Sequence, residues 1–407
     1  MLLLVSIPPI LAAMGGLSFG LDFDEPDHLA TIELIRQAHF HFSIRDMPSA
    51  TSPLFLILAS LVSLPFRELS VPVLRSFVCI LGSVSLFAIY RTLVAKRAPS
   101  PWITCVLLSV HPDYLWYCFM LMTEIPSLLW GVLALRVLSA GRLSGARRVI
   151  GGVLCAASVW TRQLWLFLPV SLALTKLPWG RALPALSGER KLFWSGIVGV
   201  ALSIPLFLIW GGFSPPIRYA TPHDLRLTLA QPALGLLLMG AYFPVLALGM
   251  RWTWKNGLVF LLACVAALFA PADFVQSWRK GEAIVNPMGP IVRALLVLGK
   301  FVPAIVIFLL VIGLIGLGAV VLMRMLQAAR SAEYSSILVL AMSVLTLQLL
   351  FVHPAWERYW MAFVLMAVVL AERTVAVSGS GRAVRYVMRG QLLFMGVGYY
   401  VYQRLTS

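Results

Sequence analysis

The chain has 407 residues, of which 60% are hydrophobic and only 12% carry a charge, whereas soluble globular domains contain about 25% charged residues. Long apolar runs recur along it, each close to the ~20 residues that a membrane-spanning helix needs. Because these runs are continuous rather than alternating, they exclude a transmembrane β-barrel. The sequence therefore predicts an all-α polytopic membrane protein, in which spans and short loops use up the chain as one domain, 1–407.

The first elements are an apolar segment and a long outer loop. Residues 1–21 lack the basic region of a signal peptide and are predicted to remain as the first span. Residues 22–74 form the outer loop, in which the spacing of Thr31, Leu34, Ile35, Ala38 and Phe42 predicts an amphipathic surface helix. The run 52–66 has 15 residues and two prolines, which is short for a span, and is predicted to lie as a second juxtamembrane helix in the outer interface.

The remaining spans fall within residues 75–402. They bring the predicted bundle to about 12 or 13 transmembrane helices of roughly 20 residues or fewer, depending on whether 391–402 crosses the bilayer. Segments 102–120 and 232–250 are each predicted as a span, and 149–161 and 163–175 are predicted as a tight pair that turns near Arg162.

The net charge tests this topology. With the N-terminus placed in the cytoplasm, the whole excess of +16 falls on the inner loops and the outer side is electrically balanced, as the positive-inside rule predicts. The basic composition is thereby explained without nucleic acid as a partner. The expected location is a bacterial inner membrane or an ER-type membrane, with the unusual charges on the extracytoplasmic face.

The segment LDFDEPDH, residues 21–28, places four acidic residues directly after the first span. Carboxylates this dense cannot lie in hydrocarbon, and their mutual repulsion favours a raised pKa for at least one of them. A carboxyl group of that kind at a membrane surface suits a general base for a hydroxyl. The alternative is a solvated helix cap that only ends the span. The charged residues of the cluster are Asp22, Asp24, Glu25, Asp27 and His28.

Further polar residues gather in other loops that the topology places on the same outer face. Each has an ordinary interpretation as an interfacial anchor, an aromatic belt or a snorkelling arginine. Their convergence predicts a cavity in which a carboxylate activates an acceptor while arginines stabilise a phosphate leaving group. The residues are Glu124 after Thr123, Arg162 and Gln163 in WTRQLW, Arg218 in the loop 210–224, and His353, Arg358 and Tyr359 in HPAWERYW.

This arrangement resembles the GT-C superfamily of polytopic membrane glycosyltransferases, which take a sugar from a polyprenyl- or dolichyl-phosphate donor. Asp24 matches in place the catalytic aspartate of that superfamily's first outer loop. The motifs are most similar to those of the α-1,2-glucosyltransferase of lipid-linked oligosaccharide assembly. Its DE-x-x-H pattern is met by Asp24, Glu25 and His28, and its later segments resemble ATSP (50–53), Thr123–Glu124, Arg162–Gln163 with Trp165, and HPAWERY (353–359).

The resemblance implies an inverting transfer in which Asp24 deprotonates an acceptor hydroxyl, with Glu25 and His28 beside it. It implies Arg162 and Arg358 as partners of the lipid phosphate, and a lipid or glycan as acceptor. No cofactor is required by the pattern, although a divalent metal held by Asp22, Asp24 and His28 stays open.

Two other functions are weighed against this one. A transporter or flippase of lipid-linked saccharide intermediates predicts ionisable residues deep within spans and repeated broken helices, and the sequence has few mid-span charges and no clear internal repeat. A non-catalytic scaffold predicts that charge-neutral changes at Asp24, Arg162 and Arg358 leave the phenotype untouched. The interacting molecules expected in every case include membrane lipids.

Overall fold

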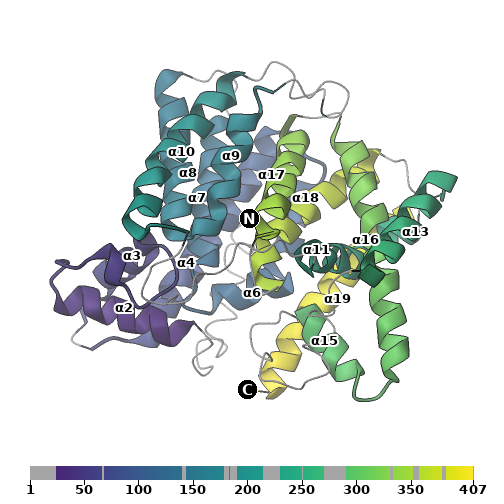
Figure 1. Ribbon diagram of the computed structural model, residues 1–407, viewed down its shortest axis with the longest axis horizontal. Helices are drawn as coiled ribbons and strands as arrows, with labels where there is room; N and C mark the ends of the chain where they lie inside the picture. The colour runs from purple at the N-terminus through teal and green to yellow at the C-terminus, as the bar shows by residue number, and fades with distance from the viewer. Residues whose placement is uncertain are drawn as a thin grey trace.

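The computed structural model describes residues 24–66, 68–139, 144–177, 183, 190–213, 230–249, 251–269, 290–330, 333–351, 357–377 and 382–406. Within these ranges every regular element is helical (Figure 1). The predicted first span, 1–21, and the predicted site residues Asp22, Arg218 and His353 lie outside the described residues.

The helices of the first half of the chain lie together, and those of the second half pack beside them (Figure 1). The first set comprises α2 (Glu25–Gln37), α3 (Pro53–Ser63), α4 (Val71–Ala95), α5 (Pro101–Ser109), α6 (Pro112–Cys118), α7 (Glu124–Leu138), α8 (Gly145–Thr161), α9 (Phe167–Leu174) and α10 (Arg190–Trp210). The second comprises α11 (Ala230–Tyr242), α12 (Pro244–Leu248), α13 (Trp254–Phe269), α15 (Pro290–Leu298), α16 (Ala304–Ala329), α17 (Glu333–Leu349), α18 (Met361–Val377) and α19 (Arg382–Thr406). Short 3-10 turns cover Ile44–Asp46, Gln163–Leu166 and Glu357–Trp360.

Several of these helices have the length and hydropathy of membrane spans. Among the described residues, α4, the Leu192–Trp210 part of α10, and α16 are long and apolar enough to cross a bilayer, with mean hydropathies of 1.9, 2.2 and 3.2. Shorter apolar helices stand beside them, including Trp254–Leu268 and Tyr334–Leu349. These features confirm the predicted class of all-helical, multi-span membrane protein.

The helices of two predicted spans are interrupted next to a proline. The segment 102–120 divides into α5 and α6 at His111, whose ψ of 133° is not helical, and Pro112 starts the second helix. The segment 232–250 divides into α11 and α12 at Phe243, where Pro244 begins the second helix. Proline disfavours the α conformation in the preceding residue and lacks the N–H needed inside a helix. Each of these two predicted spans therefore consists of two helices.

The two juxtamembrane helices lie together at one end of the bundle, where α2 packs on α3 and α3 packs on α4 and α8 (Figure 1). The short helix predicted within 52–66 is observed as α3, which starts at Pro53 and buries Phe55 and Leu56. The inward face of α2 agrees with the predicted one at Thr31 and Ile35, which are buried, but not at Leu34, which is 37% exposed. This orientation also buries the polar residues Glu25 and His28.

Candidate active site

Glu25 is the residue that fixes the start of α2 to the bundle. Its carboxylate accepts hydrogen bonds from Arg75 Nε at 2.9 Å and Nη2 at 2.5 Å, and from the Leu121 amide at 2.7 Å. Both side chains of this ion pair are fully buried. The contact ties α2 to the first turn of α4 and to the segment that leads into α7. Glu25 was predicted among the catalytic residues, but these bonds occupy both of its oxygens and suit it to positioning.

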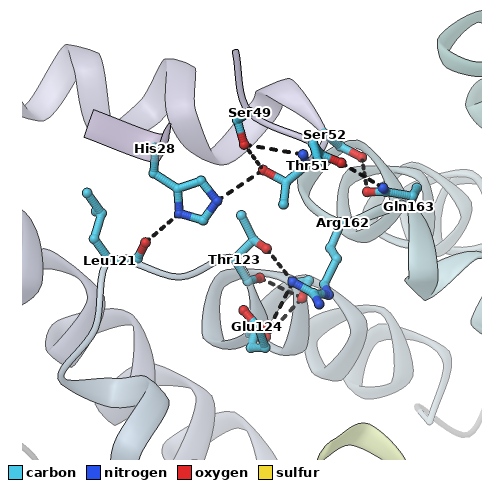
Figure 2. A network of polar contacts seen from close by, with 11 residues as sticks. His28, Ser49, Thr51, Ser52, Leu121, Thr123, Glu124, Arg162 and Gln163 are labelled. Atoms are coloured by element: carbon cyan, nitrogen blue, oxygen red, sulfur yellow. Dashed lines mark hydrogen bonds and ion pairs between the residues drawn. The ribbon is translucent and has the colours of Figure 1, made fainter. Parts of the chain in front are cut away.

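His28 lies one turn further along the same face of α2 and is also buried. Its Nδ1 is 2.6 Å from the Leu121 carbonyl oxygen, and its Nε2 is 3.4 Å from the Thr51 hydroxyl (Figure 2). A carbonyl can only accept, so Nδ1 carries the hydrogen and the Nε2 lone pair faces Thr51. Burial lowers the pKa of His28 below its ordinary value, against the opposing effect of its bond to Leu121 and the charges of Asp24 and Glu124. The imidazole is therefore neutral at physiological pH.

A polar shelf made of residues 49–52 faces this histidine (Figure 2). The Ser49 hydroxyl is 2.8 Å from that of Thr51. Gln163 then fixes the shelf to the turn between α8 and α9, because its amide donates to the Ala50 carbonyl at 2.9 Å and its carbonyl accepts from Ser52 at 3.3 Å. The ATSP and RQ segments, which the resemblance linked only by chain order, are thus in direct contact.

Arg162 occupies the turn itself, where its φ of −152° and ψ of 115° end α8. Its side chain is directed inward and is only 6% exposed, which argues against a snorkelling position at the lipid surface. Nη1 lies 2.8 Å from Glu124 Oε1 and 2.9 Å from the Thr123 hydroxyl (Figure 2). The guanidinium carbon is also 5.7 Å from the centre of the Tyr359 ring, within the range of a cation–π contact.

Asp24 stands at the N-cap of α2, and its side chain makes no capping hydrogen bond. It is partly exposed, unlike the buried Glu25. The charges of Asp24, Glu124 and Arg162 all influence the pKa of His28, so two distant segments of the chain, at the start of α7 and the end of α8, lie near the N-terminal part of α2. The N-terminus of a helix favours a negative charge at such a position.

The structure thus gathers most of the predicted site residues that it describes. The described set around His28 and Arg162 comprises Asp24, Glu25, Glu124, Gln163 and Tyr359. The Arg358 side chain lies outside the described residues. Sequence reasoning missed Arg75 and Thr51. A charged residue near the start of an apolar run was the available signal for Arg75, since such a charge needs a partner.

Of the metal site that the resemblance left open, the structure describes Asp24 and His28. The described residues include no group of three His, Cys, Asp or Glu side chains arranged to hold a metal ion. His28 directs one nitrogen to a carbonyl and the other to a hydroxyl, and Asp22 lies outside the described ranges. We therefore assign no step to a metal.

Comparison with known proteins gives a likeness of fold. An oligosaccharyltransferase from Archaeoglobus fulgidus, solved in the apo form, matches with a TM-score of 0.50 and 16% identity over 99% of this chain and 54% of that one. The chain therefore spans about half the length of that protein. The all-helical class is confirmed, and the chain shares its fold with the matching part of that protein.

Two other structures match with lower scores. Archaeal oligosaccharyltransferase AglB from Archaeoglobus fulgidus, in complex with an inhibitory peptide and a dolichol-phosphate, has a TM-score of 0.49 and 13% identity, covering 99% of this chain and 54% of that chain. ArnT from Cupriavidus metallidurans, bound to undecaprenyl phosphate, has a TM-score of 0.43 and 13% identity, covering 92% and 77%. No family model matches the chain, and no curated protein matches it in sequence.

Proposed function

We propose that this protein is an inverting membrane glycosyltransferase, which moves a sugar from a polyprenyl-phosphate donor to a hydroxyl group at the extracytoplasmic face. The observation that carries the proposal is the approach of the inward-facing Arg162 and the acidic N-terminus of α2 to one neutral histidine, His28. A cation for a leaving phosphate and a carboxylate for an acceptor hydroxyl are the two groups that such a transfer needs. The fold shared with an oligosaccharyltransferase is compatible with this chemistry.

Asp24 is the proposed base. Its carboxylate takes the proton of the acceptor hydroxyl while that oxygen attacks the anomeric carbon of the donor. The bond between the anomeric carbon and the phosphate oxygen breaks, and its electron pair stays on the phosphate oxygen. The polyprenyl phosphate leaves from the face of the sugar opposite the attacking hydroxyl, which inverts the configuration. The partly exposed position of Asp24 leaves it within reach of a substrate, whereas Glu25 is occupied by Arg75.

Arg162 is the proposed partner of the leaving phosphate. Among the described residues, its hydrogen bond and its ion pair both use Nη1, and a guanidinium has five N–H donors in a planar fork. Donors on its other nitrogens suit a phosphate oxygen, and a charge-assisted bond of this kind is stronger than one between neutral groups. Glu124 and Tyr359 hold the guanidinium in place from two sides.

His28 is proposed to position the acceptor rather than to carry the transferred proton. Its Nε2 can accept a hydrogen bond, because the hydrogen resides on Nδ1, and the nearby Thr51 hydroxyl can turn toward the acceptor or the imidazole. The low pKa that burial gives His28 keeps this acceptor available below neutral pH.

The test is mass analysis of lipid-linked sugars in cells from which the gene has been deleted. These cells are complemented with the wild type, with Asp24→Asn or with Asp46→Asn. Asp46 is an exposed aspartate of the same outer loop and serves as the matched control. We expect Asp24→Asn to reduce the transfer rate about 10²–10⁴-fold, which is the usual contribution of a general base. Asp46→Asn should restore the product. Equal products from both variants would reject Asp24 as the base.

The identity of the transferred sugar is suggested only by the motif resemblance. The similarity of Asp24, Glu25 and His28 to the pattern of an α-1,2-glucosyltransferase makes a polyprenyl-phosphate glucose the first donor to supply. Other polyprenyl-phosphate hexoses and pentoses should be supplied in parallel, and the lipid or glycan acceptor is identified from the mass of the product.

A further inference from the structure

The 3-10 turn Glu357–Trp360 carries two neighbouring aromatic residues that contact different parts of the bundle. A 3-10 helix has three residues per turn, so successive side chains point about 120° apart. Tyr359 lies over Arg162, with 5.7 Å between the centre of its ring and the guanidinium carbon. Trp360 is buried and contacts α11 in the second half of the bundle. Because the two residues are adjacent in a tight turn, the position of one ring constrains the position of the other.

Helix α11 provides a socket for the Trp360 indole, made of Gln231 and Gly235. The glycine lies so close to the six-membered part of the indole that a β-carbon there would overlap it. The indole N–H donates a hydrogen bond of 2.9 Å to Gln231 Oε1. The two socket residues are four positions apart, which places them on one face of the helix. Together they fix both the place of the indole and its rotation.

The amide of Gln231 is a polar group in apolar surroundings. The residue is fully buried in the first turn of α11, and its neighbours in the sequence AQPALGLLL are alanine, proline, glycine and leucine. Burial of an amide costs free energy unless it is hydrogen-bonded. A contact that served only to fill space could use an apolar residue here. The glutamine therefore indicates that the rotation of the indole is held, and not only its burial.

We propose that Gln231 is a positioning residue of the candidate active site, which holds Tyr359 over Arg162. It acts through Trp360, and Gly235 supplies the space for the indole. The inference rests on the proposed function, in which the guanidinium is the partner of the leaving phosphate. A guanidinium binds a phosphate best through two parallel hydrogen bonds, and an aromatic ring over the planar fork restricts the directions in which its donors point.

The first measurement follows the Arg162 side chain in the purified full-length protein, without a substrate. The protein is labelled with ¹⁵N-arginine, and the Nε–H signal of Arg162 is assigned by its loss in Arg162→Lys. An aromatic ring over the guanidinium shifts this signal, so Tyr359→Leu defines the change that follows from removal of the ring. Gln231→Leu should move the signal in the same direction. Gln231→Glu, which retains a side-chain oxygen for the indole N–H, should leave it close to its wild-type position.

Gln391→Leu is the matched control. Gln391 Nε2 donates a hydrogen bond of 2.9 Å to the carbonyl oxygen of Ala241, so this glutamine also joins a neighbouring helix to α11. Its contact lies at the C-terminal end of α11, whereas Gln231 is in the first turn. The control variant should leave the Arg162 signal unchanged. It separates a general loosening of α11 from a change at the candidate site.

The second measurement is the affinity of the protein for undecaprenyl phosphate, which presents the phosphate without a sugar. Loss of the cation–π contact is expected to weaken binding about fivefold in Tyr359→Leu and in Gln231→Leu. Because Gln231 acts through Tyr359, the double variant should bind no more weakly than Tyr359→Leu alone.

The inference is overturned if Gln231→Leu shifts the Arg162 signal no more than Gln391→Leu does. It is also overturned if the losses of affinity in Gln231→Leu and Tyr359→Leu add in the double variant. Should Gln231→Leu fail to fold, Trp360→Phe, which keeps a ring in the socket but has no N–H, is measured in its place.

Failure of the proposed function has a different signature. If Arg162→Gln binds undecaprenyl phosphate as the wild type does, the phosphate role of Arg162 is wrong. The NMR signal then decides by itself whether Gln231 holds Tyr359 in place, because that measurement requires neither a phosphate nor transfer activity.

Discussion

Removal of one partner of the ion pair between Glu25 and Arg75 should destabilise the protein more than removal of one partner of an exposed ion pair of the outer loop. Both side chains are fully buried, and removal of one partner from such a pair leaves an uncompensated charge that costs about 3–5 kcal/mol. Glu25→Leu is therefore expected to lower the thermal unfolding midpoint by on the order of 10 °C. The reason is the stranded Arg75 guanidinium, together with the loss of the acceptor for the Leu121 amide.

The double variant Glu25→Leu/Arg75→Met separates these two causes. Replacement of a buried ion pair by apolar residues of similar volume is often neutral or stabilising. The double variant should then retain only the cost of the unsatisfied Leu121 amide, about 1–3 kcal/mol, and be more stable than Glu25→Leu alone. Glu33→Leu is the matched control on the same helix, because the Glu33–Arg36 pair is partly exposed, with an N–O distance of 3.4 Å, and pairs of this kind contribute about 0–1 kcal/mol.

The assay is thermal unfolding of the purified variants in one detergent, followed by intrinsic tryptophan fluorescence. The reasoning would be refuted if Glu25→Leu were as stable as Glu33→Leu, or if the double variant were less stable than the single one. Full transfer activity in the stable double variant would further show that Glu25 acts by position alone.

Three more predictions concern the site and the core beneath it. Arg162→Lys should retain the charge but lose the planar fork, so it should slow transfer with little change in unfolding midpoint; transfer at the wild-type rate would contradict the phosphate role. Burial places the pKa of His28 below its ordinary 6.5, so the unfolded state binds more protons than the folded state below that pH and the protein loses stability on acidification. His28→Gln should reduce this loss of stability between about pH 6.5 and 5. An unchanged dependence of stability on pH in this variant would argue against a depressed pKa of His28. Gly131→Leu should destabilise the bundle by about 1–3 kcal/mol through overlap with Trp165, seen as a lower unfolding midpoint that an alanine at the exposed Gly145 does not produce.

The sequence was sufficient for features that depend on local composition. The long apolar helices, the short helix after Pro53 and the turn at Arg162 all follow from run length, proline position and a charged residue between two apolar segments. The breaks at Pro112 and Pro244 had a local signal as well, and attention to these prolines within the apolar runs would have revealed them.

Other features of the site depend on contacts that no local pattern reveals. Glu25 and Arg75 are 50 positions apart, and the histidine at 28 meets a carbonyl 93 positions away. The predicted inward face of α2 was right at Thr31 and Ile35 but wrong at Leu34, because the helix buries Glu25 and His28 against partners elsewhere in the chain. Tertiary pairing of polar groups outweighs the periodicity of a weakly amphipathic helix.

The central claim is sugar transfer from a polyprenyl phosphate with Asp24 as the base, and the most direct measurement uses purified protein in lipid vesicles. The vesicles receive polyprenyl-phosphate sugars labelled with ¹³C at the anomeric carbon, together with a lipid extract as acceptor, and the product linkage is determined by NMR. We predict a product of inverted anomeric configuration from the wild type and from Asp46→Asn, and none from Asp24→Asn. Retained configuration, or equal turnover by all three proteins, would contradict the account.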